Sequence, residues 1–191
     1  FEKDITIIPG HVNGLLSKFK NLESIRGDGV LNVGSNAFSY CEKLVTVTLP
    51  KATTIGENAF YICSQLTKVN IPNVTTIGEK AFYCCSQLTE VNIPNVTTIE
   101  ENTFASCRRL ASIVAPKTTK IKREAFRGCT SLVKAEFSPT ISDIDPSAFE
   151  RSSFALGDKK KPKLKPATEP SFDPETGILT LSSPSEFEGI K

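Results

Sequence analysis

The sequence predicts a repeat solenoid of about six to seven coils, each 22 to 23 residues long. The stretch NIPNVTTI occupies residues 70–77 and returns unchanged at 92–99, and the same apolar positions recur in every copy. A unit this short cannot bury its apolar face alone, so neighbouring copies must stack and bury one another.

The repeat is anchored by a phenylalanine that recurs every 22 residues, and finally after 23. A cysteine follows each of the first five phenylalanines by three residues, and an aliphatic residue precedes each phenylalanine by five. The phenylalanines are Phe38, Phe60, Phe82, Phe104, Phe126 and Phe149; the cysteines are Cys41, Cys63, Cys85, Cys107 and Cys129; the aliphatic residues are Val33, Ile55, Ile77, Ile99, Ile121 and Ile144. We expect these positions to form the core.

Each coil divides into three parts. LTKVNIP at 66–72 alternates apolar and polar residues, which predicts a short strand that buries Leu66, Val69 and Ile71. NVTTI at 73–77 is rich in β-branched residues and predicts a second extended segment. GEKAFYCCSQ at 78–87 is interpreted as a helical turn or two.

The chain divides into four regions by the same comparison. Residues 1–29 fit the repeat with substitutions and form a degenerate capping coil, as terminal repeats usually do. Residues 30–156 form the array, and residues 157–170 are a Lys/Pro-rich linker. Residues 171–191 contain a turn signal between apolar runs and predict a hairpin, which either caps the array or begins a further module.

The motif CSQLTKVNIPNVTTIGEKAF at 63–82 resembles the leucine-rich repeats of the BspA-like (Treponema pallidum-type) class. The resemblance covers roughly residues 4 to 156 and implies a leucine-rich repeat solenoid. It further implies an extracellular or cell-surface protein, because members of this class are typically secreted or surface-anchored and some are implicated in adhesion to host proteins or cells.

Composition and motifs argue against several other classes. A net charge of +2 is low for a nucleic-acid binder, and no apolar run reaches the length of about 20 residues that spans a bilayer. The single histidine, His11, has no assignable nucleophile, so we expect no enzyme and no cofactor. The ladder cysteines are interpreted as small buried hydrophobes rather than metal ligands or disulfides, with Cys84 more exposed.

We therefore expect a monomeric, non-catalytic binding module for a protein ligand, with host extracellular proteins among the candidates. Strand alternation places two outward rows on the first strand of each coil, and the predicted binding residues are Lys68, Asn70, Glu90, Asn92, Lys134 and Glu136. The alternative binding edge is the turn that carries Tyr61, Ile62 and Tyr83. The alternative function is a structural spacer or accessory domain of a larger surface protein. The sequence leaves open the ligand, the source, the anchoring mode and the use of the sequons at Asn73 and Asn95.

Overall fold

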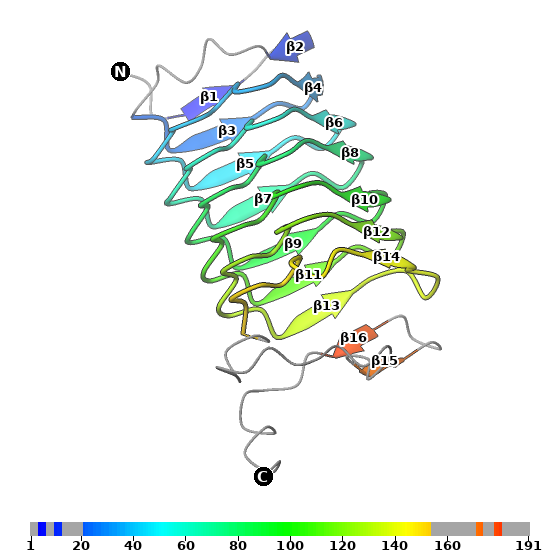
Figure 1. Cartoon of the computed structure of the whole chain (residues 1–191). Coiled ribbons are helices and arrows are strands. Elements are labelled where there is room, and N and C mark those ends of the chain that lie inside the picture. The colour runs from blue at the N-terminus through cyan, green and yellow to red at the C-terminus, as the bar shows by residue number, and fades with distance from the viewer. Residues whose placement is uncertain (1–3, 7–9, 13–20, 154–170, 174–177, 181–191) are drawn as a thin grey trace.

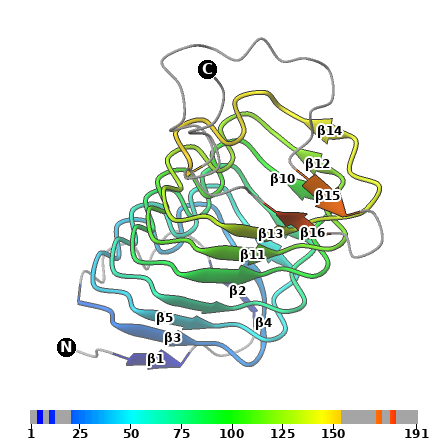
Figure 2. The same cartoon turned by 90° about the horizontal axis from the view of Figure 1, so that it is seen from below.

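The computed structural model describes residues 4–6, 10–12, 21–153, 171–173 and 178–180. These residues form a stack of similar coils, so the predicted solenoid is confirmed (Figure 1). Each coil has one side made by its first strand, one by its second strand and one by a run of turns (Figure 2). No described residue belongs to a helix that could cross a membrane.

The first strands of successive coils run parallel, in a register of one repeat in the pairs that are bonded. They are β1 (Asp4–Thr6), β3 (Ser24–Arg26), β5 (Thr46–Thr48), β7 (Lys68–Asn70), β9 (Glu90–Asn92), β11 (Ser112–Val114) and β13 (Lys134–Glu136). Thr46 pairs with Lys68, for example, and Ser112 with Lys134. The alternation in LTKVNIP therefore marks a strand at the expected place.

The second strands form a parallel set on the neighbouring side of the coil. They are β2 (Gly10–Val12), β4 (Val30–Val33), β6 (Thr54–Ile55), β8 (Thr76–Ile77), β10 (Thr98–Ile99), β12 (Lys120–Ile121) and β14 (Asp143–Ile144). Their β-branched residues suit an extended chain with one buried face.

Both sets of strands are interrupted at the same step. The first strands form the sheets β1-β3-β5-β7 and β9-β11-β13, and the second strands form β2-β4-β6-β8 and β10-β12-β14. Neither β7 with β9 nor β8 with β10 makes a strand pair. In Figure 1, β7 and β9 stand further apart than β5 and β7 do.

Two further strands follow the array. β15 (Ser171–Asp173) and β16 (Ile178–Thr180) pair antiparallel, and β16 also pairs antiparallel with β13. The sheet of β9, β11 and β13 thus continues into this hairpin. The residues between 154 and 170, where the linker is predicted, lie outside the described part of the chain, and the division into domains stays a prediction.

The predicted helical turn at 78–87 is wrong, because this segment is a run of turns. Lys80 and Cys84 have φ angles of 53° and 58°, in the left-handed region that a right-handed helix does not use. Alternate amides then point to the next coil instead of back along the chain. The amide of Phe60, for example, donates to the carbonyl of Ala81 at 2.8 Å.

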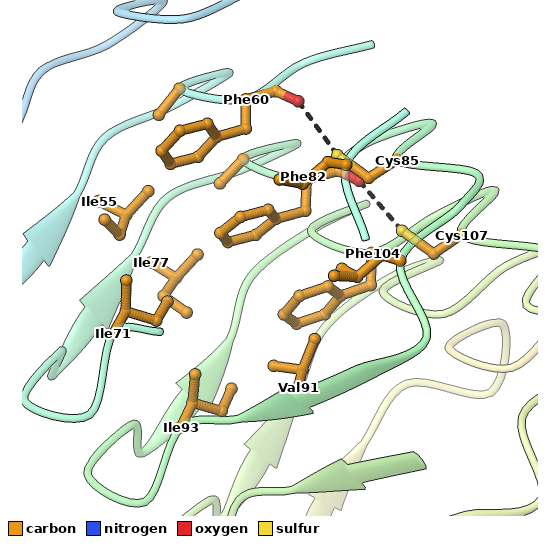
Figure 3. Close-up of a cluster of buried hydrophobic side chains, with 14 of the residues drawn as sticks. Ile55, Phe60, Ile71, Ile77, Phe82, Cys85, Val91, Ile93, Phe104 and Cys107 are labelled. Carbon is orange, nitrogen blue, oxygen red and sulfur yellow. Dashed lines mark hydrogen bonds between the residues drawn. The ribbon is translucent and has the colours of Figure 1, made fainter. Parts of the chain in front are cut away.

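The core consists of the ladders that the repeat predicts. Rings of Phe38, Phe60, Phe82, Phe104 and Phe126 are buried, and successive rings stack with centroids 5.2 to 5.5 Å apart. The aliphatic rungs lie beside them (Figure 3). Each of four ladder thiols donates to the carbonyl of a phenylalanine in the preceding coil, as Cys85 does to Phe60 at 3.2 Å.

Ile144 departs from the predicted core, since it is 39% exposed while the equivalent residues of earlier coils are buried. β14 is the last strand of its sheet, so no described coil covers the side of Ile144 that faces away from the array. Phe149, at the end of the aromatic ladder, is only partly buried although its ring stacks on Phe126 at 5.2 Å.

Candidate functional site

The outward side chains of the first strands form one continuous surface, which we call the strand face. It comprises the two rows Ser24, Thr46, Lys68, Glu90, Ser112 and Lys134, and Arg26, Thr48, Asn70, Asn92, Val114 and Glu136. All twelve are exposed or half-buried, whereas the residue between each pair points inward. The alternation predicted from the sequence is therefore confirmed for the orientation of these side chains.

A groove of about 470 Å³ lies on the strand face across β5, β7, β9 and β11. The predicted binding residues Lys68, Asn70, Glu90 and Asn92 all line it. Thr46, Thr48, Ser112 and Val114 complete its rim. Strands far apart in the sequence thus bring four predicted residues together in one depression.

Lys68 and Glu90 are the two charged residues of this groove, and neither has an ion-pair partner among the described residues. They occupy the same position in adjacent coils, where opposite charges usually meet in this molecule. Lys120 meets Asp143 at 2.6 Å and Arg123 meets Glu101 at 2.7 Å in this way. The wider step between β7 and β9 keeps Lys68 and Glu90 apart.

The other two predicted binding residues, Lys134 and Glu136, lie outside the groove. The Nζ of Lys134 is 3.0 Å from Oε1 of Glu136, so the two side chains pair with each other. Their strand, β13, also pairs with β16 through Lys134↔Thr180 and Glu136↔Ile178. The structure therefore separates the six predicted residues into a group of four and a neutralised pair.

Val69 was expected to be buried, and this expectation is wrong. It is partly buried and lines the groove, whereas the equivalent Val47 and Val91 are 1% and 5% exposed. Val69 lies beside the step at which the strands do not pair, so the next coil covers it less completely. The groove consequently has an apolar floor between its polar walls.

The alternative edge carries a row of tyrosines that partly cover one another. The rings of Tyr61 and Tyr83 stack with centroids 5.1 Å apart and planes 12° apart, which leaves the ring edges to face outward. Burial is the largest cause that raises the pKa of Tyr61, and the charges that Tyr40, Tyr83 and Cys84 would carry when ionised raise it further. Ile62 lies half-buried beside this row.

Tyr40 belongs to this edge and was not predicted. Its ring meets that of Tyr61 edge-on at a centroid distance of 5.5 Å. Tyr40 occupies the repeat position of Ile62 rather than that of Tyr61, so the repeat alone gives no sign that the two rings touch. A depression of about 400 Å³ beside the row is lined mainly by polar side chains, including Asn58, Lys80 and Asn102.

The ladder cysteines are buried, as predicted, and all six cysteines are free thiols. Burial raises the pKa of Cys41 to about 11 and that of Cys129 to about 12, and it raises the pKa of Cys85 and Cys107 strongly. Cys84 is the more exposed thiol, as expected. Among the described residues, no group of three or more His, Cys, Asp or Glu side chains is placed to hold a metal ion.

The two sequon asparagines contact the preceding coil. The side-chain amide of Asn73 donates to the carbonyl of Pro50 at 2.7 Å, and that of Asn95 donates to Pro72 at 3.2 Å. Both side-chain nitrogens therefore form hydrogen bonds that link neighbouring coils.

Comparison with known proteins agrees with this architecture. The model of the BspA type leucine rich repeat region matches in six copies, over residues 31–155 and 97–191. A leucine rich cell surface protein from Faecalibacterium prausnitzii A2-165 has a solved structure that is 31% identical, with a TM-score of 0.71 over 78% of this chain. Comparison with curated sequences finds no match.

Two more distant structures support the fold. The leucine-rich repeat protein of T. pallidum is 23% identical with a TM-score of 0.56, and the match covers 74% of each chain. A leucine-rich repeat protein from Eubacterium ventriosum is 21% identical with a TM-score of 0.59, over 85% of this chain and 61% of that one. The chain spans 45% of the length of the Faecalibacterium protein.

Stacked coils of this kind, with a grooved strand face, define a leucine-rich repeat solenoid, a scaffold class that generally binds proteins. Within that class, this chain belongs to the BspA type leucine-rich repeat family.

Proposed function

We propose that this chain is a non-catalytic protein-binding module of a secreted or cell-surface protein, and that it binds its ligand through the strand face. The groove across β5 to β11 carries the proposal, because it joins an apolar floor to polar side chains, of which Lys68 and Glu90 form no ion pair with any described residue. Buried apolar contact with a polar rim is the usual composition of a protein interface.

The residues of the strand face also differ from coil to coil while the core stays constant. Lys68 is followed by Glu90 and then by Ser112 at one position, whereas the phenylalanine beneath never changes. A surface that varies in charge along a fixed scaffold suits recognition of one particular ligand. The four groove residues, rather than the paired Lys134 and Glu136, form the proposed contact site.

The cell-surface part of the proposal is supported by the relative from Faecalibacterium, which is described as a cell surface protein. By the resemblance of the family, the ligand is a host extracellular protein and the module acts in attachment. The second candidate function is a spacer that holds another domain away from the cell. The hairpin β15–β16, which continues the sheet beyond β13, favours it as a place where a further module joins.

Binding to immobilised extracellular-matrix and plasma proteins tests the proposal. A binding module retains one of them saturably, whereas a spacer retains none. On the protein retained, the double variant Lys68→Glu with Glu90→Lys should bind at least about tenfold more weakly, or 1.4 kcal/mol. The matched control is Lys134→Glu with Glu136→Lys, which exchanges an existing ion pair outside the groove and should leave affinity unchanged. Equal losses in both variants would remove the groove as the site.

A further inference from the structure

The backbone ladder of the first strands is interrupted at one step, between β7 and β9. At the steps on either side, the amide of Leu49 donates to the carbonyl of Asn70 at 2.9 Å and that of Ile93 donates to Val114 at 2.9 Å. The equivalent amide of Ile71 has no hydrogen-bond partner within the described residues. We call this interrupted junction the open step.

The second strands are open at the same step. The amide of Gly78 donates to Ile55 at 2.8 Å in the coil before, and Lys122 donates to Ile99 at 2.9 Å in the coil after. The amide of Glu100, between them, makes no such bond within the described part of the chain. The strand bonds are therefore missing on two sides of the coil, while the corner between them stays joined through Asn95, which donates to Pro72 at 3.2 Å.

The third side of the coil stays closed. Across the open step, the amide of Phe82 donates to the carbonyl of Thr103 at 2.9 Å, and Cys84 donates to Ala105 at 2.9 Å. The two coils at this step are thus bonded to each other along the turn edge but not along their strands. The strand pairs divide the array into two blocks, β1 to β8 and β9 to β14.

The opening lies where the position of Glu100 changes from glycine to a residue that carries a Cβ. Its position is glycine in the two coils before, Gly56 and Gly78, and those glycines touch the preceding coil closely. A Cβ at Gly78 would lie only 2.6 Å from the amide nitrogen of Glu57. Glu100 carries a Cβ at the equivalent place, so it cannot keep the close spacing of the glycine coils. Lys122 and Asp145 also carry a Cβ at this position, yet their amides donate to Ile99 and Ile121 at 2.9 Å each. The opening therefore coincides with the change from glycine-bearing coils to coils with a Cβ.

Thr103 adds bulk at the same junction. The equivalent residues in the other coils of the array, from Ala37 to Ala148, are alanine, and Thr103 is fully buried. Its hydroxyl donates to the carbonyl of Glu100 at 2.8 Å and lies 3.5 Å from the carbonyl of Gly78 in the preceding coil. Thr103 therefore adds bulk at the junction, while its carbonyl and hydroxyl still contact the preceding coil at Phe82 and Gly78.

The open step leaves two backbone amides without ladder bonds, each next in sequence to the groove-lining residues Asn70 and Glu90. Among the described residues, the amides of Ile71 and Thr89 find no partner for the ladder bonds that their equivalents make, and the partly buried Val69 lines the groove. Unpaired strand edges are templates for another extended chain, since backbone amides must find partners when they are covered.

We propose that the open step receives an extended peptide segment of the protein ligand, whose backbone supplies the hydrogen bonds that β7 and β9 do not make with each other. This inference rests on the proposed function and names the kind of partner that the groove fits. Main-chain hydrogen bonds give such strand addition its affinity, and alternate side chains give it specificity. Lys68 and Glu90, unpaired on the two sides, select one acidic and one basic side chain of the segment.

Binding of a strand within the step requires the two blocks to pivot apart. Paired strands lie about 4.8 Å apart, so a strand between two others needs about twice that distance. The bonded turn edge at Phe82 and Cys84 is the axis of this motion, which also breaks the hydrogen bond from Asn95 to Pro72. The turn edge stays closed while the groove widens.

A closing variant tests the proposal without touching a groove residue. Glu100→Gly with Thr103→Ala introduces the residues that the preceding coil has at these positions, Gly78 and Ala81, and should close the step. The matched control, Glu100→Ala with Thr103→Val, removes the same polar groups but keeps both Cβ atoms and the branched bulk of the Thr103 side chain. Hydrogen exchange at the amides of Ile71 and Thr89 should slow by at least about tenfold in the closing variant only.

The binding probe is a capped synthetic peptide of about nine residues that alternates threonine and valine, with one central glutamate and one central lysine. Wild type and the control variant should bind it at least about tenfold more tightly than the closing variant. A version with N-methylated amides along one edge should lose binding to the same degree, because it cannot donate to a strand.

Equal affinity of wild type and closing variant for the peptide, or no binding to wild type, would overturn the open-step proposal. The strand-face proposal is judged separately, on the retained extracellular protein with the Lys68→Glu and Glu90→Lys variant. If that charge exchange weakens binding while closure does not, the groove binds its ligand without strand addition. If neither changes the affinity, both proposals fall.

Discussion

Phe82 and Phe104 stack with ring centroids 5.5 Å apart and planes 6° apart, across the very step at which the strands do not pair. The aromatic ladder therefore holds the two blocks together where the backbone ladder does not. Both rings are fully buried, and Phe82 also stacks on Phe60 at 5.2 Å.

Phe82→Ala should accordingly be among the most damaging substitutions. Removal of a buried phenylalanine ring typically costs about 3–5 kcal/mol, and here it also breaks the stack at the open step. Tyr83→Ala, one residue further out, removes a half-buried ring and should cost about 1 kcal/mol. Chemical denaturation of both variants measures the difference, and similar midpoints would show that the turn does not hold the blocks together.

The thiols should react in a fixed order. The thiolate is the reactive form, and burial raises the pKa of Cys41, Cys85, Cys107 and Cys129. Titration of the native protein with a thiol reagent should therefore find one fast site, at the more exposed Cys84, and the remainder only after denaturation. Cys84→Ser should abolish the fast phase. A fast phase that persists in this variant contradicts the assignment.

Stability should fall at alkaline pH. A thiol whose pKa is higher in the folded state contributes stability that is present below the unfolded pKa, about 8.5, and is lost as the pH rises through the folded pKa. For Cys41 and Cys129 the folded pKa values are about 11 and 12, so the loss begins near pH 8.5 and extends to that range. Each such thiol contributes a slope of up to about 1.4 kcal/mol per pH unit.

The control for this pH dependence is Cys129→Ala. It should lower stability at neutral pH because it removes buried volume, and it should make the alkaline slope shallower by the share of one thiol. Unfolding midpoints in denaturant from pH 7 to about 10 give the two slopes. Parallel slopes would mean that other groups set the alkaline limit.

The architecture was predictable because the same apolar letters recur at every coil, and only a stack of coils buries them. The turn was not, because its apolar residues Ala81, Phe82 and Cys85 have a spacing that a helix shares. The asparagines Asn36, Asn58 and Asn102 gave a usable signal, since asparagine favours the left-handed conformation that each of them adopts.

The groove was predictable only in part. Alternation in LTKVNIP places Lys68 and Asn70 outward, and the repeat aligns Glu90 and Asn92 with them. The step between these strands opens even though NIPNVTTI is identical in the two coils. It coincides with a change elsewhere in the repeat, from Gly78 to Glu100, and a Cβ at Gly78 would meet the backbone of another coil. A contact of this kind depends on the spacing between coils, which cannot be predicted from the sequence of a single coil.

The left-handed turn positions should respond to glycine. Gly128 has a φ of 71°, and a Cβ there would meet its nearest neighbour, in Ser106, at 3.7 Å, which is ordinary contact. Gly128→Ala should therefore cost about 1 kcal/mol through backbone strain alone. Ser106, with a φ of 62°, is the converse case, and Ser106→Gly should raise stability. Thermal unfolding compares the two, and a stabilising Gly128→Ala would contradict the strain argument.

The tyrosine row should contribute to stability and not to binding. The stacked faces of Tyr61 and Tyr83 are closed to a ligand, and this edge lies on a different side of the coil from the groove. Tyr61→Ala with Tyr83→Ala should lower the unfolding midpoint yet leave affinity for the retained extracellular protein within about twofold. The variant Lys68→Glu with Glu90→Lys should do the reverse. If the tyrosine variant loses binding while the charge variant keeps it, the ligand site lies on the turn edge.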